Sequence, residues 1–178
     1  MTFPRITTGT QTDAAQITSV DLAMMRRAIE LARQAALEGE VPVGAVVYAG
    51  EEIIAEGYNL RETSSDPVAH AELLAISRAG KARNDWRLND CSLAVTLEPC
   101  PMCAGAMVNA RVGRVIYGAD DPKAGACCSL YTIPTDARLN HEVTVIPGVM
   151  ADICGQLLRD FFRERREQKK LERLTRTG

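Results

Sequence analysis

The sequence predicts an α/β fold, in which helices cover both faces of a mostly parallel β-sheet. Segments with the 3.6-residue period of amphipathic helices alternate along the chain with short apolar runs that are typical of buried strands. The first two of these runs form a hairpin pattern, which favours an antiparallel edge. A length of 178 residues with 46% hydrophobic content indicates one domain with a substantial core.

The expected elements follow in order along the chain. An amphipathic helix begins near Thr18, which with Asp21 resembles a capping box, and ends near Gly39. Apolar runs at 43–48 and 53–58 flank a tight turn and predict the hairpin. The remaining elements are a polar loop at 61–67, a helix from His70 to Gly80, a strand at 93–97, a helix at 103–110, strands at 115–118 and 143–146 around a loop at 119–140, and a final helix from Ala151.

Composition limits the cellular context. Residues 1–19 lack both a basic start and an apolar segment, so we expect a flexible N-terminal tail and no secretory signal. No apolar run approaches the 18 or so residues of a membrane span, so we expect a cytoplasmic protein without a membrane partner. The six cysteines are then expected to be reduced, and those at 91, 127, 128 and 154 to be small buried side chains.

Charge is unevenly distributed. The whole chain carries a net charge of −2, but residues 159–178 contain eight Lys or Arg and four Asp or Glu. We therefore expect a core domain at 20–166 and a basic C-terminal extension at 167–178. The basic segment is either a phosphate contact or a solvated helix with ordinary charge pairing.

Two short segments about 30 residues apart carry metal-binding chemistry, His70-Ala71-Glu72 and Pro99-Cys100-Pro101-Met102-Cys103. One imidazole and two thiolates are three strong zinc ligands, and a site with three protein ligands keeps a position open for water. Two thiolates cancel the charge of the metal, so Glu72 is needed as a general base. A redox pair or half of a structural zinc site is the alternative, but the only other histidine is His141 and no second Cys-x-x-Cys exists.

The pattern His-x-Glu followed by Pro-Cys-x-x-Cys is typical of zinc-dependent nucleobase deaminases. The wider chain resembles the bacterial tRNA-specific adenosine deaminases of the cytidine deaminase-like superfamily. The matching segments are 40–46, 58–59, 66–72, 95–125 and 157–163. The resemblance implies the three-layer α/β/α cytidine deaminase-like fold, with a mixed five-stranded sheet.

The resemblance also implies roles for single residues. His70, Cys100 and Cys103 would bind one Zn²⁺ per subunit, Glu72 would shuttle protons, and Asn59 would contact the entering base. For Ala71 it is the geometry of a helix start, not the resemblance, that leads us to expect a backbone N–H presented to the substrate. Further RNA contacts would come from Asp121, Lys123, Phe161, Phe162 and Arg163. The chain departs from the usual pattern at Asp120, where an arginine is often found, and at Cys127-Cys128, where small residues are usual.

The implied reaction is hydrolytic deamination of adenosine to inosine at the wobble position, A34, of a tRNA anticodon, with release of ammonia. The implied partners are a tRNA anticodon stem-loop and a second copy of the chain in a homodimer. A deaminase of a free nucleobase or nucleoside, guanine or cytosine, would share every zinc residue and need no basic tail. A zinc-stabilised RNA-binding module without turnover is a third possibility, but it has no use for Glu72.

Overall fold

The computed structural model describes residues 16–176, and its centre is one five-stranded mixed sheet in the order β2-β1-β3-β4-β5. The strands are β1 (Gly44–Ala49), β2 (Glu52–Tyr58), β3 (Ser92–Leu97), β4 (Arg114–Ala119) and β5 (Thr144–Ile146). β1 pairs antiparallel with both β2 and β3, whereas β3, β4 and β5 are parallel. The predicted hairpin edge and the mixed five-stranded sheet are confirmed, but only half of the pairings are parallel.

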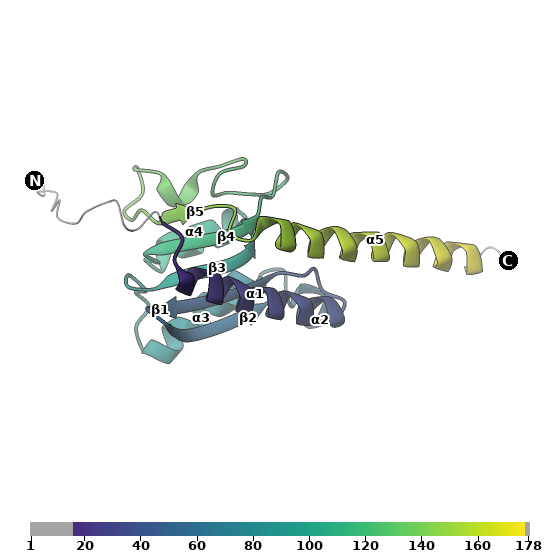
Figure 1. Ribbon diagram of the computed structural model, residues 1–178, viewed down its shortest axis with the longest axis horizontal. Helices are drawn as coiled ribbons and strands as arrows, with labels where there is room; N and C mark the ends of the chain where they lie inside the picture. The colour runs from purple at the N-terminus through teal and green to yellow at the C-terminus, as the bar shows by residue number, and fades with distance from the viewer. Residues whose placement is uncertain (1–15, 177–178) are drawn as a thin grey trace, which may run out of the picture.

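Helices cover both faces of this sheet and produce three layers (Figure 1). α1 (Ser19–Leu37) and the first half of α5 (Ala151–Arg176) pack on one face, and α3 (Ala71–Arg83) and α4 (Pro101–Asn109) pack on the other. Each strand serves both faces, because successive side chains alternate. On β1, Ala45 and Val47 face α3 and α4, while Val46 and Tyr48 face α1.

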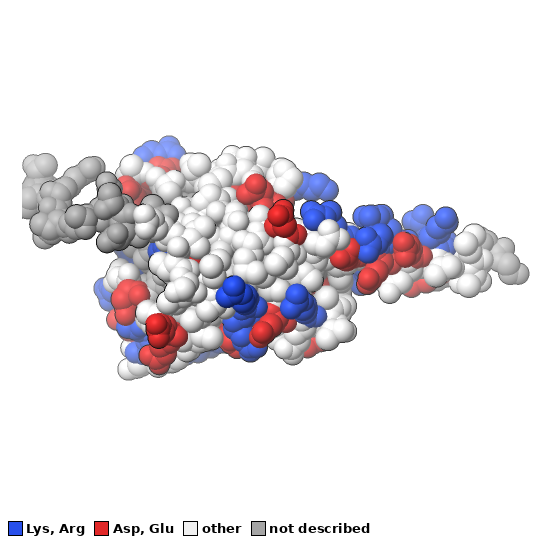
Figure 2. Space-filling view, viewed as in Figure 1, with Lys and Arg blue, Asp and Glu red and all other residues white. Residues whose placement is uncertain are grey.

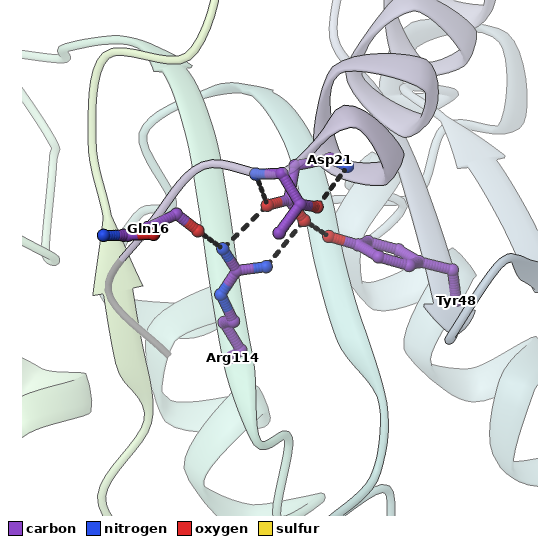
Figure 3. A network of polar contacts seen from close by, with 5 residues as sticks. Gln16, Asp21, Tyr48 and Arg114 are labelled. Atoms are coloured by element: carbon purple, nitrogen blue, oxygen red, sulfur yellow. Dashed lines mark hydrogen bonds and ion pairs between the residues drawn. The ribbon is translucent and has the colours of Figure 1, made fainter. Parts of the chain in front are cut away.

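Helix α1 is fixed to the sheet by a buried carboxylate at its first turn. Asp21 and Thr18 form the predicted capping box, in which each side chain accepts a hydrogen bond from the backbone N–H of the other. The same carboxylate accepts a hydrogen bond from Tyr48 on β1 at 2.5 Å and two from Arg114 on β4, at 2.6 and 2.7 Å (Figure 3). One side chain therefore joins a helix start to two strands.

Some boundaries differ from the sequence prediction. The helix after His70 continues past Gly80 to Arg83, because Asn84 rather than Gly80 adopts the left-handed conformation that ends it. The polar loop at 61–67 contains a short helix, α2 (Arg61–Ser64), and the loop at 119–140 contains a 3-10 turn, η1 (Ile133–Thr135).

The last helix is much longer than its contact with the sheet. α5 has 26 residues, and its C-terminal half extends away from the body (Figure 1). It runs without interruption through the expected domain boundary at 166, so this boundary stays a prediction. The expected N-terminal tail lies mostly at residues 1–15, outside the described residues. Within residues 16–176 no helix is both long and apolar enough to cross a membrane.

Candidate active site

The two motif segments meet beyond the carboxyl end of β3, each at the start of a helix. His70 is the N-cap residue of α3, and Cys100 is the N-cap residue of α4, with Pro101 in its first turn. Cys103 lies one turn along α4 and is fully buried. Helix N-termini have unpaired N–H groups and a positive dipole end, so the start of α4 favours the thiolate form of Cys100.

The three ligand atoms form a triangle with the dimensions of a tetrahedral metal site. His70 Nδ1 lies 3.7 Å from Cys100 Sγ and 3.5 Å from Cys103 Sγ, and the two sulfurs are 3.6 Å apart. Zinc bond lengths of about 2.3 Å to sulfur and about 2.0 Å to nitrogen place two sulfurs about 3.8 Å apart and a nitrogen and a sulfur about 3.5 Å apart in a tetrahedron. The residues brought together therefore fit this metal.

The three ligand side chains shift one another's pKa values. The hydrogen bond with Cys103 lowers the pKa of Cys100 to about 4. Contact with Cys100 raises the pKa of His70, and the contact with Cys100 raises the pKa of Cys103. Cys100 is therefore a thiolate at neutral pH, whereas His70 and Cys103 hold protons that a bound cation would displace.

Glu72 lies inside a cavity of about 210 Å³ beside the metal triangle. Its side chain is only 4% exposed, and burial raises the pKa of its carboxyl group. A carboxyl group with a raised pKa can both accept and release a proton near neutral pH, as a general acid–base requires. The cavity is smaller than the roughly 300–1,000 Å³ of drug-sized pockets, so it accepts one base rather than a whole nucleotide.

Asn59 and Ala71 also line this cavity. Ala71 is the first residue of α3, so its N–H is among those that the helix leaves unpaired. Asn59 is buried at the end of β2, and its Nδ2 donates a hydrogen bond to Glu40 at 3.1 Å. The two expected base contacts therefore line the same cavity as His70.

The loop that carries Asp121 and Lys123 is held by the carboxylate of Glu98. Glu98 is 2% exposed and accepts hydrogen bonds from the N–H groups of Asp121, Cys127, Cys128 and Ser129, at 2.7–3.1 Å, and from the hydroxyl of Ser129. Gly125 is required here, because a Cβ atom would lie 2.1 Å from Glu98 Oε2. Asp121 lines the cavity, whereas Lys123 is exposed outside it.

The aromatic pair on α5 divides between core and surface, as the helical spacing predicts. Phe161 is buried, and Phe162 is 45% exposed. Both border a second hollow of about 280 Å³ between α5 and residues 39–41, here called the α5 groove, which is also lined by Glu62, Arg165, Arg166 and Lys169. Arg163 lies outside the groove and pairs with Asp160 at 2.6 Å.

Lys and Arg gather on one side of the projecting part of α5, while acidic side chains gather on the other (Figure 2). Val41 lines both the α5 groove and the cavity that contains Glu72, here called the base cavity, so the two hollows are neighbours.

Sequence reasoning missed Glu40 and Glu98 as parts of the site. Both are buried carboxylates that hold cavity walls, and the available signal was an acidic residue at the edge of an apolar run, Glu40 before 41–48 and Glu98 after 93–97. The prediction that all four remaining cysteines are buried is wrong for Cys128, which is exposed. Its backbone N–H donates to Glu98 at 2.7 Å, so the residue is fixed by its backbone while the residue as a whole stays exposed.

Comparisons with known proteins agree with this geometry. A sequence model of the MafB19-like deaminases matches residues 20–166. The tRNA-specific adenosine deaminase of Bacillus subtilis (strain 168) is 49% identical over 153 residues, which cover 86% of this chain and 95% of that protein. A solved structure from a study of A-to-I editing by tRNA:A34 deaminases at the wobble position of transfer RNA matches with a TM-score of 0.73 and 38% identity, covering 76% of this chain and 99% of that one.

A guanine deaminase from Bacillus subtilis matches over a smaller part of the chain. Its structure has a TM-score of 0.54 and 44% identity, and the match covers 55% of this chain and 63% of that one. The matches to the tRNA enzymes cover a larger share of both aligned chains, and the solved structure among them has a TM-score of 0.73. The chain is therefore a MafB19-like deaminase and belongs to the family of the tRNA-specific adenosine deaminases.

Proposed function

We propose that the chain is a zinc-dependent hydrolytic deaminase that converts adenosine to inosine at the wobble position, A34, of tRNA anticodons. One observation carries this proposal. The buried carboxylate of Glu72 lies beside His70, Cys100 and Cys103, whose ligand atoms are spaced for a tetrahedral metal ion, and it lines a cavity large enough for one nucleobase. Likeness to enzymes named tRNA-specific adenosine deaminase over 86% of the chain supplies the substrate class.

His70, Cys100 and Cys103 would hold one Zn²⁺ per subunit. When bound, this ion supplies a Lewis acid that makes water nucleophilic near neutral pH. Glu72 then moves the protons. It accepts one proton as the water oxygen adds to C6 of adenine and delivers that proton to N1. It next carries the remaining proton of the added hydroxyl to the amino group, and the C6–N6 bond breaks to release ammonia and leave inosine.

Asn59 and Ala71 orient the base during these steps. Asn59 offers amide groups and Ala71 offers a backbone N–H at the cavity wall, so both can hydrogen-bond the edges of a base turned out of the anticodon loop. Asp121, in the loop held by Glu98, also lines the cavity. Orientation of this kind makes the attack on C6 effectively intramolecular.

The α5 groove is the proposed site for the RNA strand that flanks the target base. Phe162 is an exposed ring on which a neighbouring base can stack, and Arg165, Arg166 and Lys169 supply cations for phosphates. Lys123, exposed in the loop after β4, and Arg163, exposed on α5, complete the proposed contacts. The local positive charge of α5 thus outweighs the whole-chain charge of −2.

We further propose a deaminase domain at residues 20–166 that acts in the cytoplasm as a homodimer. The family match over the same residues supports the domain limits. Sedimentation analysis of the purified protein tests the dimer directly, since the monomer has a mass of 19.4 kDa.

The substrate assay compares an anticodon stem-loop that contains A34 with the same stem-loop carrying G34, and with free adenosine, guanine and cytosine. Released ammonia is measured, and inosine is identified after digestion of the RNA. We expect inosine from the A34 stem-loop alone. Efficient deamination of free guanine or cytosine with no inosine from the stem-loop would replace this proposal with a free-base deaminase.

A further inference from the structure

A second carboxylate, Glu40, lies inside the wall between the base cavity and the α5 groove. Its position follows from the way that α1 ends. Gly39 adopts the left-handed conformation, with φ +80°, and its N–H bonds to the carbonyl of Ala36, while the N–H of Glu40 bonds to the carbonyl of Ala35. This is the Schellman arrangement of a helix C-terminus, and it directs the Glu40 side chain into the protein, where the residue is 0% exposed.

The carboxylate of Glu40 accepts hydrogen bonds from two different elements, α2 and the residue that follows β2. Oε1 accepts a hydrogen bond from the N–H of Thr63 in α2 at 2.6 Å, and Oε2 accepts one from Nδ2 of Asn59 at 3.1 Å. Burial acts to raise the pKa of Glu40, but hydrogen bonds from Thr63 and Glu62 and the nearby charge of Arg61 together outweigh it, so the pKa lies below its ordinary value. The group is therefore ionised and can only accept hydrogen bonds.

An acceptor-only neighbour fixes which way the Asn59 amide is turned. Asn59 must present its nitrogen to Glu40, which leaves Oδ1 on the other side of the amide, and within residues 16–176 no side chain or backbone group donates to Oδ1. The base cavity therefore receives an amide of set polarity, with an oxygen acceptor in a known position.

The residues on either side of Glu40 connect it to the α5 groove. The carbonyl of Gly39 accepts a hydrogen bond from Arg165 of α5 at 3.4 Å, and Val41 lines both hollows. One three-residue segment thus separates the proposed RNA strand from the target base.

We propose that Glu40 is a positioning residue, which sets the rotation of the Asn59 amide in the base cavity and ties it to the α2 wall of the α5 groove. The inference rests on the proposed function, because Asn59 is the group through which Glu40 would act on the base. Glu40 itself does not touch the substrate.

Replacing Glu40 with Gln should turn the Asn59 amide over. A glutamine has one acceptor oxygen, and the shorter bond from Thr63 would keep it. The glutamine NH₂ group would then face Asn59, whose amide would turn over to present its own oxygen. The cavity would receive a donor in place of an acceptor while the volume of the side chain stays the same.

The test is a double-mutant cycle with Glu40→Gln, Asn59→Ala and both changes together, measured as single-turnover deamination at saturating A34 stem-loop. Loss of a hydrogen bond to a charged group predicts a rate at least roughly tenfold lower for Glu40→Gln. In the Asn59→Ala background the same change should cost less than about twofold, because the group that it orients is already absent. Glu51→Gln, in the exposed β1–β2 turn, is the matched control and should leave the rate unchanged.

Equal losses in both backgrounds would overturn the proposal, since Glu40 would then act by another route. If Glu40→Gln loses its metal or its thermal stability, the contact is tested with the double variant Glu40→Gln with Asn59→Asp. This variant exchanges donor and acceptor, because an amide at position 40 can donate to a carboxylate at position 59. Regained metal content and melting temperature support the contact, and failure to regain them refutes it. If the wild-type protein deaminates guanine and not RNA, the proposed function is wrong but the positioning role of Glu40 is still open to test. The same double-mutant cycle is then run with guanine as the substrate.

Discussion

Replacing Asp21 with Asn should destabilise the protein by about 3 kcal/mol. The carboxylate accepts two charge-assisted hydrogen bonds from Arg114, one from Tyr48 and one from the N–H of Thr18, and the residue is 1% exposed (Figure 3). Breaking a buried ion pair by removing one charge costs about 3–5 kcal/mol. The Arg114 side chain retains 15% exposure to water, which places the cost at the lower end.

Acidification should produce the same loss in the wild-type protein. Burial acts to raise the pKa of Asp21, but hydrogen bonds from Arg114, Tyr48 and Thr18 outweigh it and hold the pKa well below its ordinary value. A carboxyl group with a depressed folded pKa contributes its full stability above the unfolded pKa of about 3.9 and loses it as pH falls towards the folded value. The difference in unfolding free energy between wild type and Asp21→Asn should therefore shrink as pH falls from about 5 to about 3.

Urea unfolding followed by circular dichroism measures both effects, with wild type and variant always compared at the same pH and the same metal content. A loss of about 3 kcal/mol corresponds to a melting temperature roughly 6–12 °C lower for a chain of this size. Asp152→Asn, an exposed first-turn acid in α5, is the matched control and should change stability by less than about 1 kcal/mol. A difference below about 1 kcal/mol for Asp21→Asn, or one that is constant with pH, would refute the reasoning.

Four further outcomes are expected at the site. Glu72→Gln should retain zinc and RNA binding but keep less than about a tenth of the activity, because the proton carrier is lost. Cys103→Ala should lose zinc, as measured by elemental analysis, since two protein ligands hold the ion poorly. Glu98→Gln should speed hydrogen exchange of the N–H groups at 127–129, which it now binds. Stem-loop affinity should fall with salt at a slope of about −0.7 per phosphate contact, and Arg166→Ala should reduce that slope by about one contact.

Sequence reasoning located the elements and the metal ligands because both depend on local patterns. The capping box at Thr18 and the hairpin at 43–58 are formed by residues close in sequence, and a ligand set of one His and two Cys is recognised by residue type and spacing. The antiparallel pairing of β1 with β3 joins residues about 50 apart, as in Ala45 with Val95, and no local pattern predicts it. The sequence therefore predicted the antiparallel hairpin but not this second antiparallel pairing.

The supporting carboxylates were not predictable for a related reason. Glu40 and Glu98 obtain their roles from groups distant in sequence, such as Asn59 for Glu40 and Ser129 for Glu98. An isolated acidic residue at the end of an apolar run is most often a solvated one. Only the tertiary structure shows that these two are buried and that backbone N–H groups converge on them.

The three buried glutamates near the cavity show how one residue type supplies different functions. Hydrogen bonds outweigh burial at Glu40 and Glu98 and hold the pKa of each below its ordinary value, so these groups remain charged and cannot carry protons at neutral pH. At Glu72 burial dominates and raises the pKa, so this group can take up a proton and release it. The number of N–H donors that the fold directs at each carboxylate therefore separates the proton carrier from the two residues that hold the cavity around it.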